Sequence, residues 1–430
     1  MSARPEFAEH EDRAAVLAEL HLRPFQAFAT PQRFHHFAFV IAPGDGAREQ
    51  AAFTALCGEL GLAAPGPHAR FHVVNSGEWT LRWELHAEFA SYTWNSDSGA
   101  GTPFARTAAD LPSAFRAYQP AGRLLVAVDL ALVPRLASPE DIEAPFERSS
   151  LTAIAASEDC AIVASDFRPD DAGVMRILIE DLALTPTRAG RLVQRVLELE
   201  TYRCLALLGL PVARRTEPVV RRAEEELLRL SREMTGTPST AANHRILQEI
   251  TALSAELETQ LAATTFRLGA TRAYAELVSG RLDVIRAREH GGYVSFSRFL
   301  RRRFSPAIAT CAAIDARQQA LAVRLAHATD LLRTRIQSDL EDQNRLLLAS
   351  MNRRSRLQLR LQQTVEGLSI AAVSYYVVGL LGYIAKGAKD AGALPAMVTP
   401  ELASALSVPV VVVGIWWLLH RARRAWGSEK

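Results

Sequence analysis

Cysteine is scarce in this chain of 430 residues, which has only 4, at positions 57, 160, 204 and 311. They form no C-x-x-C pair, the spacing typical of structural zinc sites and redox motifs. The sequence therefore argues against a zinc site and a disulfide framework. It favours reduced thiols in a cytoplasmic protein.

The chain also has no excess of charge of one sign. It has 49 Lys and Arg against 47 Asp and Glu, a net charge of +2, whereas nucleic-acid-binding domains usually carry a basic patch. It contains no Walker loop, G-x-G-x-x-G, H-E-x-x-H or G-x-S-x-G motif. We therefore expect no nucleic-acid partner and no required cofactor, and we expect a non-enzyme rather than an enzyme.

Two long uncharged apolar runs are present instead, at 368–385 and 402–419, each of 18 residues. At ~1.5 Å per residue such a helix reaches ~27 Å, close to the ~30 Å hydrocarbon core of a bilayer. Neither run has the polar stripe of a helix that packs on a soluble core. The sequence therefore predicts a two-helix transmembrane hairpin over 367–420.

Basic residues flank this hairpin on both sides. Four arginines precede the first run and three follow the second, whereas the loop between the runs has two lysines offset by two acidic residues. Basic flanks stay in the cytoplasm, and the polar first residues, MSARPEFAEHEDR, do not resemble a signal peptide. We expect both termini, including a basic tail over 421–430, to be cytoplasmic, with the hairpin in a bacterial inner membrane.

Residues 1–185 mix strand and helix patterns. Helices are predicted at 9–20, 47–60 and 139–147 between segments rich in Val, Ile, Leu and Phe, which are typical of strands. These predicted strands are 33–42, 70–75, 80–89, 123–132, 160–167 and 174–182. We expect a cytoplasmic mixed α/β domain whose strand order cannot be derived from the sequence.

Long helices replace strands from residue 187 onward, and we expect a stalk domain over 186–366. Its predicted helices are 187–208 (stopped by Gly209 and Pro211), 218–234, 239–290 and one that starts near Ser297 and has no stop before the membrane. Apolar residues recur along them at spacings of three, four and seven, which indicates coiled-coil packing within the chain or between subunits. The sequence thus predicts an α+β membrane protein, with a homo-oligomer expected.

The segment 80–89 carries the best cluster of candidate site residues. Because side chains alternate along a strand, its two faces differ. One face has Arg82, Glu84, His86 and Glu88, and the other has Leu81, Trp83, Leu85 and Phe89. His86 and Glu88 are candidates for an acid–base or metal site, with His21 or His35 nearby. Alternatively, this face is the solvated side of a half-buried strand.

Arg23 is the third candidate. Pro24 disfavours the helical conformation at Arg23, and an arginine in an extended turn can bind a carboxylate or phosphate through two hydrogen bonds. The alternative is an ion pair between Arg23 and Glu84 or Glu88. If the protein is an enzyme, we expect Arg23, His86 and Glu88 to form its catalytic region.

One stripe of the first apolar run joins small residues, two tyrosines and a lysine at helical spacing. These residues are Ala372, Tyr376, Gly379, Tyr383 and Lys386. Small residues allow close helix approach, and phenol hydroxyls facing lipid would stay unpaired. The stripe is therefore either a packing seam or the lining of a pore.

Four strings of the sequence resemble an uncharacterised family of bacterial membrane-anchored proteins, known as a domain of unknown function. They are ELHLRPF (19–25), HAEFASYTW (86–94), TCAAIDARQQAL (310–321) and LQQTVEGLSIAAVSYYVVGLLGYIAKG (361–387). The resemblance covers nearly the whole chain. It implies inner-membrane anchoring and no established activity, so it assigns no catalytic residue.

The order of the predicted parts is similar to that of CorA-type magnesium transporters, which are pentamers with the first span lining the pore. Their Gly-Met-Asn motif should close the first span, but residues 383–387 read YIAKG here. Lys386 at that mouth would repel divalent cations. The resemblance therefore implies the architecture more than cation transport.

Three hypotheses for the function remain open. The protein is a membrane-anchored scaffold or sensor, or a CorA-like ion channel or transporter, or a membrane-tethered enzyme. Because two spans per chain cannot enclose an aqueous path, the second hypothesis requires an oligomer.

Overall fold

The computed structural model describes most of the chain, and its contacts divide the chain into two compact units. The described residues are 10–11, 13, 17, 25–67, 69–97, 103–104, 115, 118–236, 239–285, 288–390 and 399–427. Unit 1 comprises Met1–Pro238 and Arg245–Thr329, and unit 2 comprises Ser239–His244 and Asp330–Lys430. The helix predicted at 9–20 lies largely outside the described residues.

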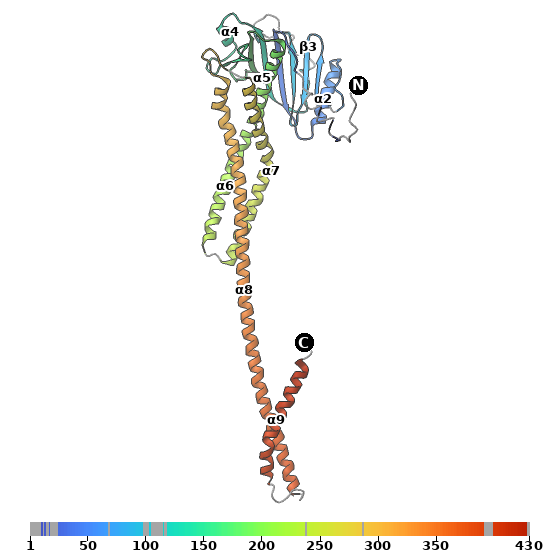
Figure 1. The fold of residues 1–430 in the computed structure, drawn as a ribbon, viewed down its shortest axis with the longest axis vertical. Coiled ribbons are helices and arrows are strands. Elements are labelled where there is room, and N and C mark those ends of the chain that lie inside the picture. Colours follow the sequence, from blue (N-terminus) through green and yellow to red (C-terminus); the bar gives the residue numbers. More distant parts are fainter. Residues whose placement is uncertain are drawn as a thin grey trace. The chain divides into compact units, whose positions relative to one another are not determined.

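Unit 1 is built on a nine-stranded sheet with strand order β2-β3-β4-β1-β5-β8-β7-β6-β9. Figure 1 shows the part of this sheet that contains β3 beside α2. The pair β5–β8 is parallel and every other pair is antiparallel. The strands are β1 (Gln32–Val40), β2 (Phe71–Asn75), β3 (Trp79–Leu85), β4 (Phe89–Ser96), β5 (Arg123–Pro134), β6 (Thr152–Ala156), β7 (Ala161–Ser165), β8 (Met175–Asp181) and β9 (Arg288–Glu289).

Each of the six predicted strands corresponds to a strand of this sheet, whereas β4, β6 and β9 were not predicted. The strand predicted at 80–89 was too long. It ends at Leu85, where His86 N donates a 2.8 Å hydrogen bond to Phe89 O and turns the chain into β4. The alternation therefore stops at this turn, and Phe89 does not share a face with Leu81, Trp83 and Leu85.

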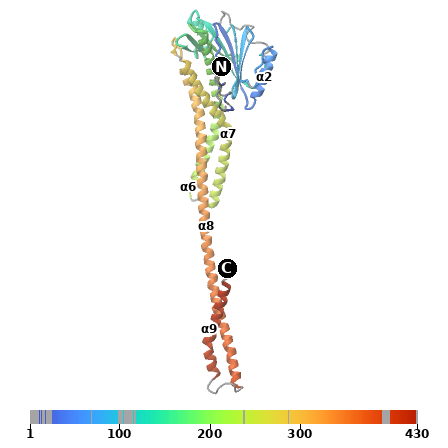
Figure 2. The same cartoon turned by 45° about the vertical axis from the view of Figure 1, so that its right-hand side comes forward.

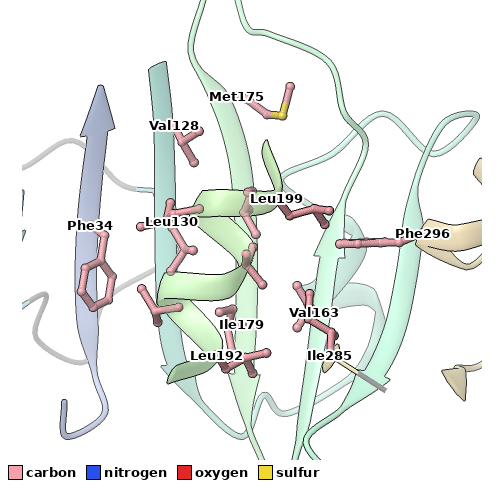
Figure 3. Packing of buried hydrophobic residues seen from close by; sticks show 14 of the residues in the cluster. Phe34, Val128, Leu130, Val163, Met175, Ile179, Leu192, Leu199, Ile285 and Phe296 are labelled. Atoms are coloured by element: carbon pink, nitrogen blue, oxygen red, sulfur yellow. The ribbon is translucent and has the colours of Figure 1, made fainter. Parts of the chain in front are cut away.

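Helix α5 (Pro186–Leu207) covers one face of the sheet. Thr185 caps its start, because the Thr185 side chain accepts a hydrogen bond from the backbone N–H of Arg188. Pro186 is the first helical residue, a position where the backbone N–H has no partner within the helix, so proline fits there. Leu192 and Leu199 of α5 lie over the strands that carry Leu130 and Ile179 (Figure 3). This apolar core fixes α5 on the sheet.

Helix α2 (Gly46–Glu59) packs on the opposite face of β1, β3 and β4 (Figures 1 and 2). Phe53 of α2 stacks on Trp83 of β3 with ring centroids 4.6 Å apart, and both side chains are fully buried. This end of the sheet is therefore covered on both faces.

The other described helices of unit 1 are α4 (Pro139–Glu143), α6 (Gly209–Thr235), most of α7 (Thr240–Ile285) and the first part of α8 (Phe296–Asp390). The prediction that a helix begins only at residue 218 was wrong, because α6 already begins at Gly209. Pro211 lies in the first turn of α6, where a backbone N–H has no hydrogen-bond partner within the helix, so proline is tolerated there. A Cβ on Gly209 would lie 2.1 Å from Thr271 Oγ1, so only glycine fits there.

Unit 2 contains the rest of α8 and α9 (Pro400–Gly427). Among the described helices, α8 is long and apolar enough to cross a membrane, and the apolar part of α9, Ser404–Leu418, is shorter. The two helices touch where a Cβ on Gly382 would lie 2.9 Å from Ser404 Oγ. The α+β class, the N-terminal sheet domain and the long helix are thus confirmed.

Candidate functional site

A narrow pocket lies between the sheet and α5 within unit 1 and opens to solvent; its space is about 650 Å³ when the solvent at its mouth is included. Strands β1, β3 and β4 form its floor, and α5 forms its opposite wall. Its apolar lining includes Phe28, Phe34, Phe89, Val193, Leu197 and Tyr202. Its polar lining includes Gln26, His36, Arg82, Glu84, His86, Ser91, Thr93, Asn95, Gln194, Glu198 and Thr201. A mixed lining of this kind is typical of small-molecule sites.

The alternation of β3 decides which side chains reach the pocket. Leu81, Trp83 and Leu85 face α2, as the sequence predicts, and Arg82 and Glu84 face the pocket. The polar face is not solvated, however, since Arg82 is only 8% exposed. Helix α5 covers it.

Three charged or titratable side chains form a compact cluster on the pocket floor. Arg82 Nε donates to Glu84 Oε1 at 2.5 Å, and His86 Nε2 lies 3.4 Å from Glu84 Oε2. Burial raises the pKa of Glu84, but the hydrogen bond from His86 and the charge of Arg82 lower it to about 2. Glu84 is therefore a carboxylate over the whole physiological pH range.

A polar chain leads from this cluster across the pocket to α5. Arg82 Nη1 donates to Gln194 Oε1 at 3.5 Å, and Gln194 Nε2 donates to Glu198 Oε1 at 2.8 Å. Arg281 of α7 then pairs with Glu198 at 2.5 Å. Because each group is held by the next, their positions are fixed before any ligand binds.

His36 of β1 is the second histidine of the pocket, and it is buried. Its Nδ1 lies 2.8 Å from Thr93 Oγ1 and its Nε2 lies 2.9 Å from Thr201 Oγ1. Burial lowers the pKa of His36 to about 4, with Arg82 and His86 acting in the same direction and Glu84 against them. His36 is therefore a neutral imidazole held from both sides.

The structure separates the predicted pair His86 and Glu88. Glu88 lies in the turn after β3 and forms a two-bond ion pair with Arg267 of α7, at 2.6 and 3.2 Å. His86 points into the pocket toward Glu84. The predicted third member, Arg23, lies outside the described residues, and so does His21.

His35 does not join the pocket either. It lies on the other face of β1, where Arg33 donates to Asp129 at 2.7 and 3.0 Å and His35 Nδ1 is 3.9 Å from the same carboxylate. In the part of the chain that the structure describes, no three His, Cys, Asp or Glu side chains are grouped to hold a metal ion. A metal at His86 or Glu88 therefore stays a prediction without geometric support.

Sequence reasoning missed the contributions of α5, namely Gln194, Glu198 and Thr201. Their spacing of four and three residues places them on one helix face, but α5 also carries Arg188, Arg191, Arg195, Glu200 and Arg203, so this polar face does not stand out in the sequence. The sequence could not show that this face of α5 packs against β3, because Arg82 and Gln194 are 112 residues apart.

In unit 2 the predicted stripe does not pack against α9. Tyr376 and Tyr383 are 71% and 78% exposed, whereas Ser374 is buried and Gly382 contacts Ser404. A shallow groove of about 620 Å³ beside this contact includes Gly379, Tyr383 and Lys386 in its lining. The groove is also lined by Glu401 and Ser404 of α9, so this end of the stripe borders the contact between the two helices, while Tyr376 and Tyr383 stay largely exposed.

The chain belongs to a family described as "Protein of unknown function (DUF3422)", whose model matches residues 8–426. This match confirms the predicted membership of an uncharacterised family. No curated protein and no solved structure matches the chain. The similarity to CorA-type transporters stays a prediction.

Proposed function

We propose that the protein is a membrane-anchored sensor or scaffold that binds a small organic molecule in the pocket between β1, β3, β4 and α5. The observation that carries this proposal is the convergence of fixed polar groups inside an aromatic pocket. The aromatic walls suit an apolar or aromatic part of a ligand, and Arg82, His86 and Gln194 supply hydrogen bonds for a polar part.

The same geometry favours binding over catalysis. A general base works best when its pKa lies near the working pH, but the pKa of Glu84 is about 2 and that of His36 is about 4. Glu84 is also held by Arg82, and His36 by two threonines. Glu88, in turn, pairs with Arg267 and is separated from His86. A membrane-tethered enzyme that uses Arg23, His86 and Glu88 is therefore the less supported alternative.

The anchor that we propose is a two-helix hairpin in a bacterial inner membrane. Its support is the apolar part of α8, which is largely exposed, and the shorter apolar part of α9. The arginines before and after these parts favour a cytoplasmic location for both flanks. A cysteine introduced at Gly392 should react with an impermeant maleimide outside intact cells, whereas Cys57 should not. Equal labelling of both would contradict this orientation.

We further propose that the lipid-proximal part of α8 joins the chain to a second copy of itself. Nine large apolar side chains between 340 and 365 are 42–72% exposed, yet charges among them exclude this segment from a bilayer core. Leu340 and Leu347 are seven residues apart and Leu361 lies fourteen residues further on, which matches the register of a coiled-coil seam that is interrupted by Arg354. So many exposed apolar side chains on one helix favour burial against a partner helix.

Disulfide cross-linking tests this interface. In full-length chain whose own 4 cysteines are replaced, Leu347→Cys should give cross-linked dimers under mild oxidation. Asn352→Cys is the matched control, because residue 352 lies off the seam. Equal cross-linking of the two variants, or none, would contradict a seam through Leu347.

Ligand binding is tested by thermal unfolding of the detergent-solubilised full chain against a panel of amino acids, nucleobases and aromatic acids. At least one class should raise the unfolding temperature of the wild type. Ser91→Phe, which adds a ring inside the pocket, should abolish this shift, and Ala55→Phe on the exposed side of α2 should retain it. An equal shift in both variants would place the binding elsewhere.

Ion passage is the second candidate function, and the exposure of the two stripe tyrosines favours it. Tyr376 and Tyr383 are exposed in a single chain, so in an oligomer this face is free to line a central path. Lys386 would then form a cationic ring at the mouth. Lys386→Asn should raise cation flux into liposomes, and no flux from either protein would leave the sensor or scaffold as the better account.

A further inference from the structure

A second pocket in unit 1 is basic rather than aromatic. It has about 1080 Å³ of space, partly open to solvent, between α5, the turn after β6 and the end of α7. Its lining comprises Ser157, Glu158, Arg188, Arg191, Arg195, Asp283, Val284 and Ile285. It shares no residue with the first pocket.

The three arginines occupy one face of α5 because their spacing is three and four residues. Arg188 is engaged: it pairs with Glu158 at 3.3 Å and donates to Cys160 Sγ at 3.7 Å. Arg191 lies over the Phe25 ring at 5.2 Å. In the part of the chain that the structure describes, neither Arg191 nor Arg195 forms an ion pair with a carboxylate. With respect to the described residues, these two neighbouring guanidiniums are thus available to an anion from solution.

The surroundings of Arg195 make a bound anion favourable. Burial lowers the pKa of Arg195, and the neighbouring guanidiniums of Arg191 and Arg281 lower it further, while Glu198 acts against them. Glu198 pairs directly with Arg281, so its negative charge mainly offsets the charge of Arg281 and less that of Arg195. A half-buried cation among other cations gains from an added counter-charge.

The turn that borders this pocket has an unusual backbone. Ser157, Glu158 and Asp159 are consecutive non-glycine residues with φ of 53°, 63° and 63°. L-residues rarely adopt this left-handed conformation, and each such residue costs roughly 1–2 kcal/mol. Arg188 holds Glu158, and Arg288 holds Asp159 at 3.0 Å. Strain of this kind concentrates at functional sites, which adds a second observation at the pocket.

We propose that Arg191 and Arg195 bind the phosphate group of a small phosphorylated molecule in this second pocket. Two guanidiniums side by side suit a tetrahedral dianion with several acceptor oxygens, whereas a planar carboxylate is satisfied by one. Glu158 and Asp283 also face the pocket. Glu158 is neutralised by Arg188, and Asp283 at the rim accepts hydrogen bonds from hydroxyl or amino groups of the same ligand.

The test uses full-length protein in detergent and inorganic phosphate as the probe, with binding measured by isothermal titration calorimetry. Wild type should bind phosphate more tightly than acetate, with chloride at equal ionic strength as the blank. Arg191→Gln/Arg195→Gln should weaken phosphate binding about tenfold or more, because two charged hydrogen-bond donors are lost. Arg191→Lys/Arg195→Lys, which keeps the charge and loses the forked geometry, should weaken it less.

The matched control is Arg222→Gln/Arg232→Gln, which removes the same charge from the exposed side of α6 and should leave phosphate binding unchanged. Circular dichroism establishes that each variant is folded. The proposal is overturned if wild type binds no phosphate, if acetate binds as tightly, or if both glutamine variants lose binding equally. Because neither pair of arginines lines the first pocket, these results are independent of its proposed ligand.

Discussion

The two faces of β3 both carry buried side chains, but their chemistry differs. Toward α2, Leu81 and Trp83 are fully buried in an aromatic core. Toward α5, Arg82 is nearly as buried but packs among charges and hydrogen-bonding groups. Burial of charge costs free energy even when the charges are paired, so the polar face is poorly explained by stability alone. This difference is why we assign recognition to the α5 face.

The largest stability effect should come from the apolar face. Trp83→Ala should lower the free energy of unfolding by about 3–5 kcal/mol, because it removes a fully buried ring that stacks on Phe53. Chemical denaturation of the full chain measures this loss. Leu124→Ala on the exposed side of β5 is the control and should change stability by less than about 0.5 kcal/mol. Similar losses in both would mean that the α2 face is not a packed core.

The polar face should be sensitive to unpaired charge. The sequence alone predicts an exposed, tolerant Arg82, but Arg82→Met would leave Glu84 buried without its guanidinium, at a cost of about 3 kcal/mol. Arg82→Met/Glu84→Met removes both charges and should recover most of this loss. A fully additive double variant would show that the two side chains do not interact.

A smaller effect should appear as a pH dependence of stability. The pKa of His36 is 6.5 in the unfolded chain and about 4 when folded, so between these values the unfolded chain binds more protons. Stability should therefore fall as the pH drops below 6.5, by roughly 2 kcal/mol at pH 5. His36→Gln, which cannot titrate but keeps hydrogen-bonding groups for Thr93 and Thr201, should not show this fall. Parallel curves for the two proteins would contradict a buried neutral His36.

The sequence predicts much of the fold because its signals are local. The alternation of Leu81, Arg82, Trp83 and Glu84 correctly assigns both faces of β3. The loss of the strand pattern near residue 187 likewise places the start of α5 within one residue, at Pro186. The proline at 218 misleads, because it lies inside α6. The same alternation wrongly predicts one continuous strand through Phe89, because the turn at 86–88 contains neither the glycine nor the proline that usually marks a turn.

The candidate site was less predictable, because it depends on contacts distant in sequence. Nothing near Glu88 indicates that Arg267 pairs with it, 179 residues away. The exposure of Arg82 was also misjudged, since an alternating strand does not show whether its polar face meets water or another polar surface. The stripe on α5 that carries Gln194 and Glu198 supplies that surface.

The most direct test of the central claim, that the α5 face is a recognition site, is native mass spectrometry of the full chain purified under mild conditions. Wild type should carry a small bound molecule that is absent from Ser91→Phe and retained by Ala55→Phe. Such a result would also yield the mass of the ligand. Identical bound masses in wild type and Ser91→Phe, or no bound molecule in wild type together with no response to the ligand panel, would contradict the account.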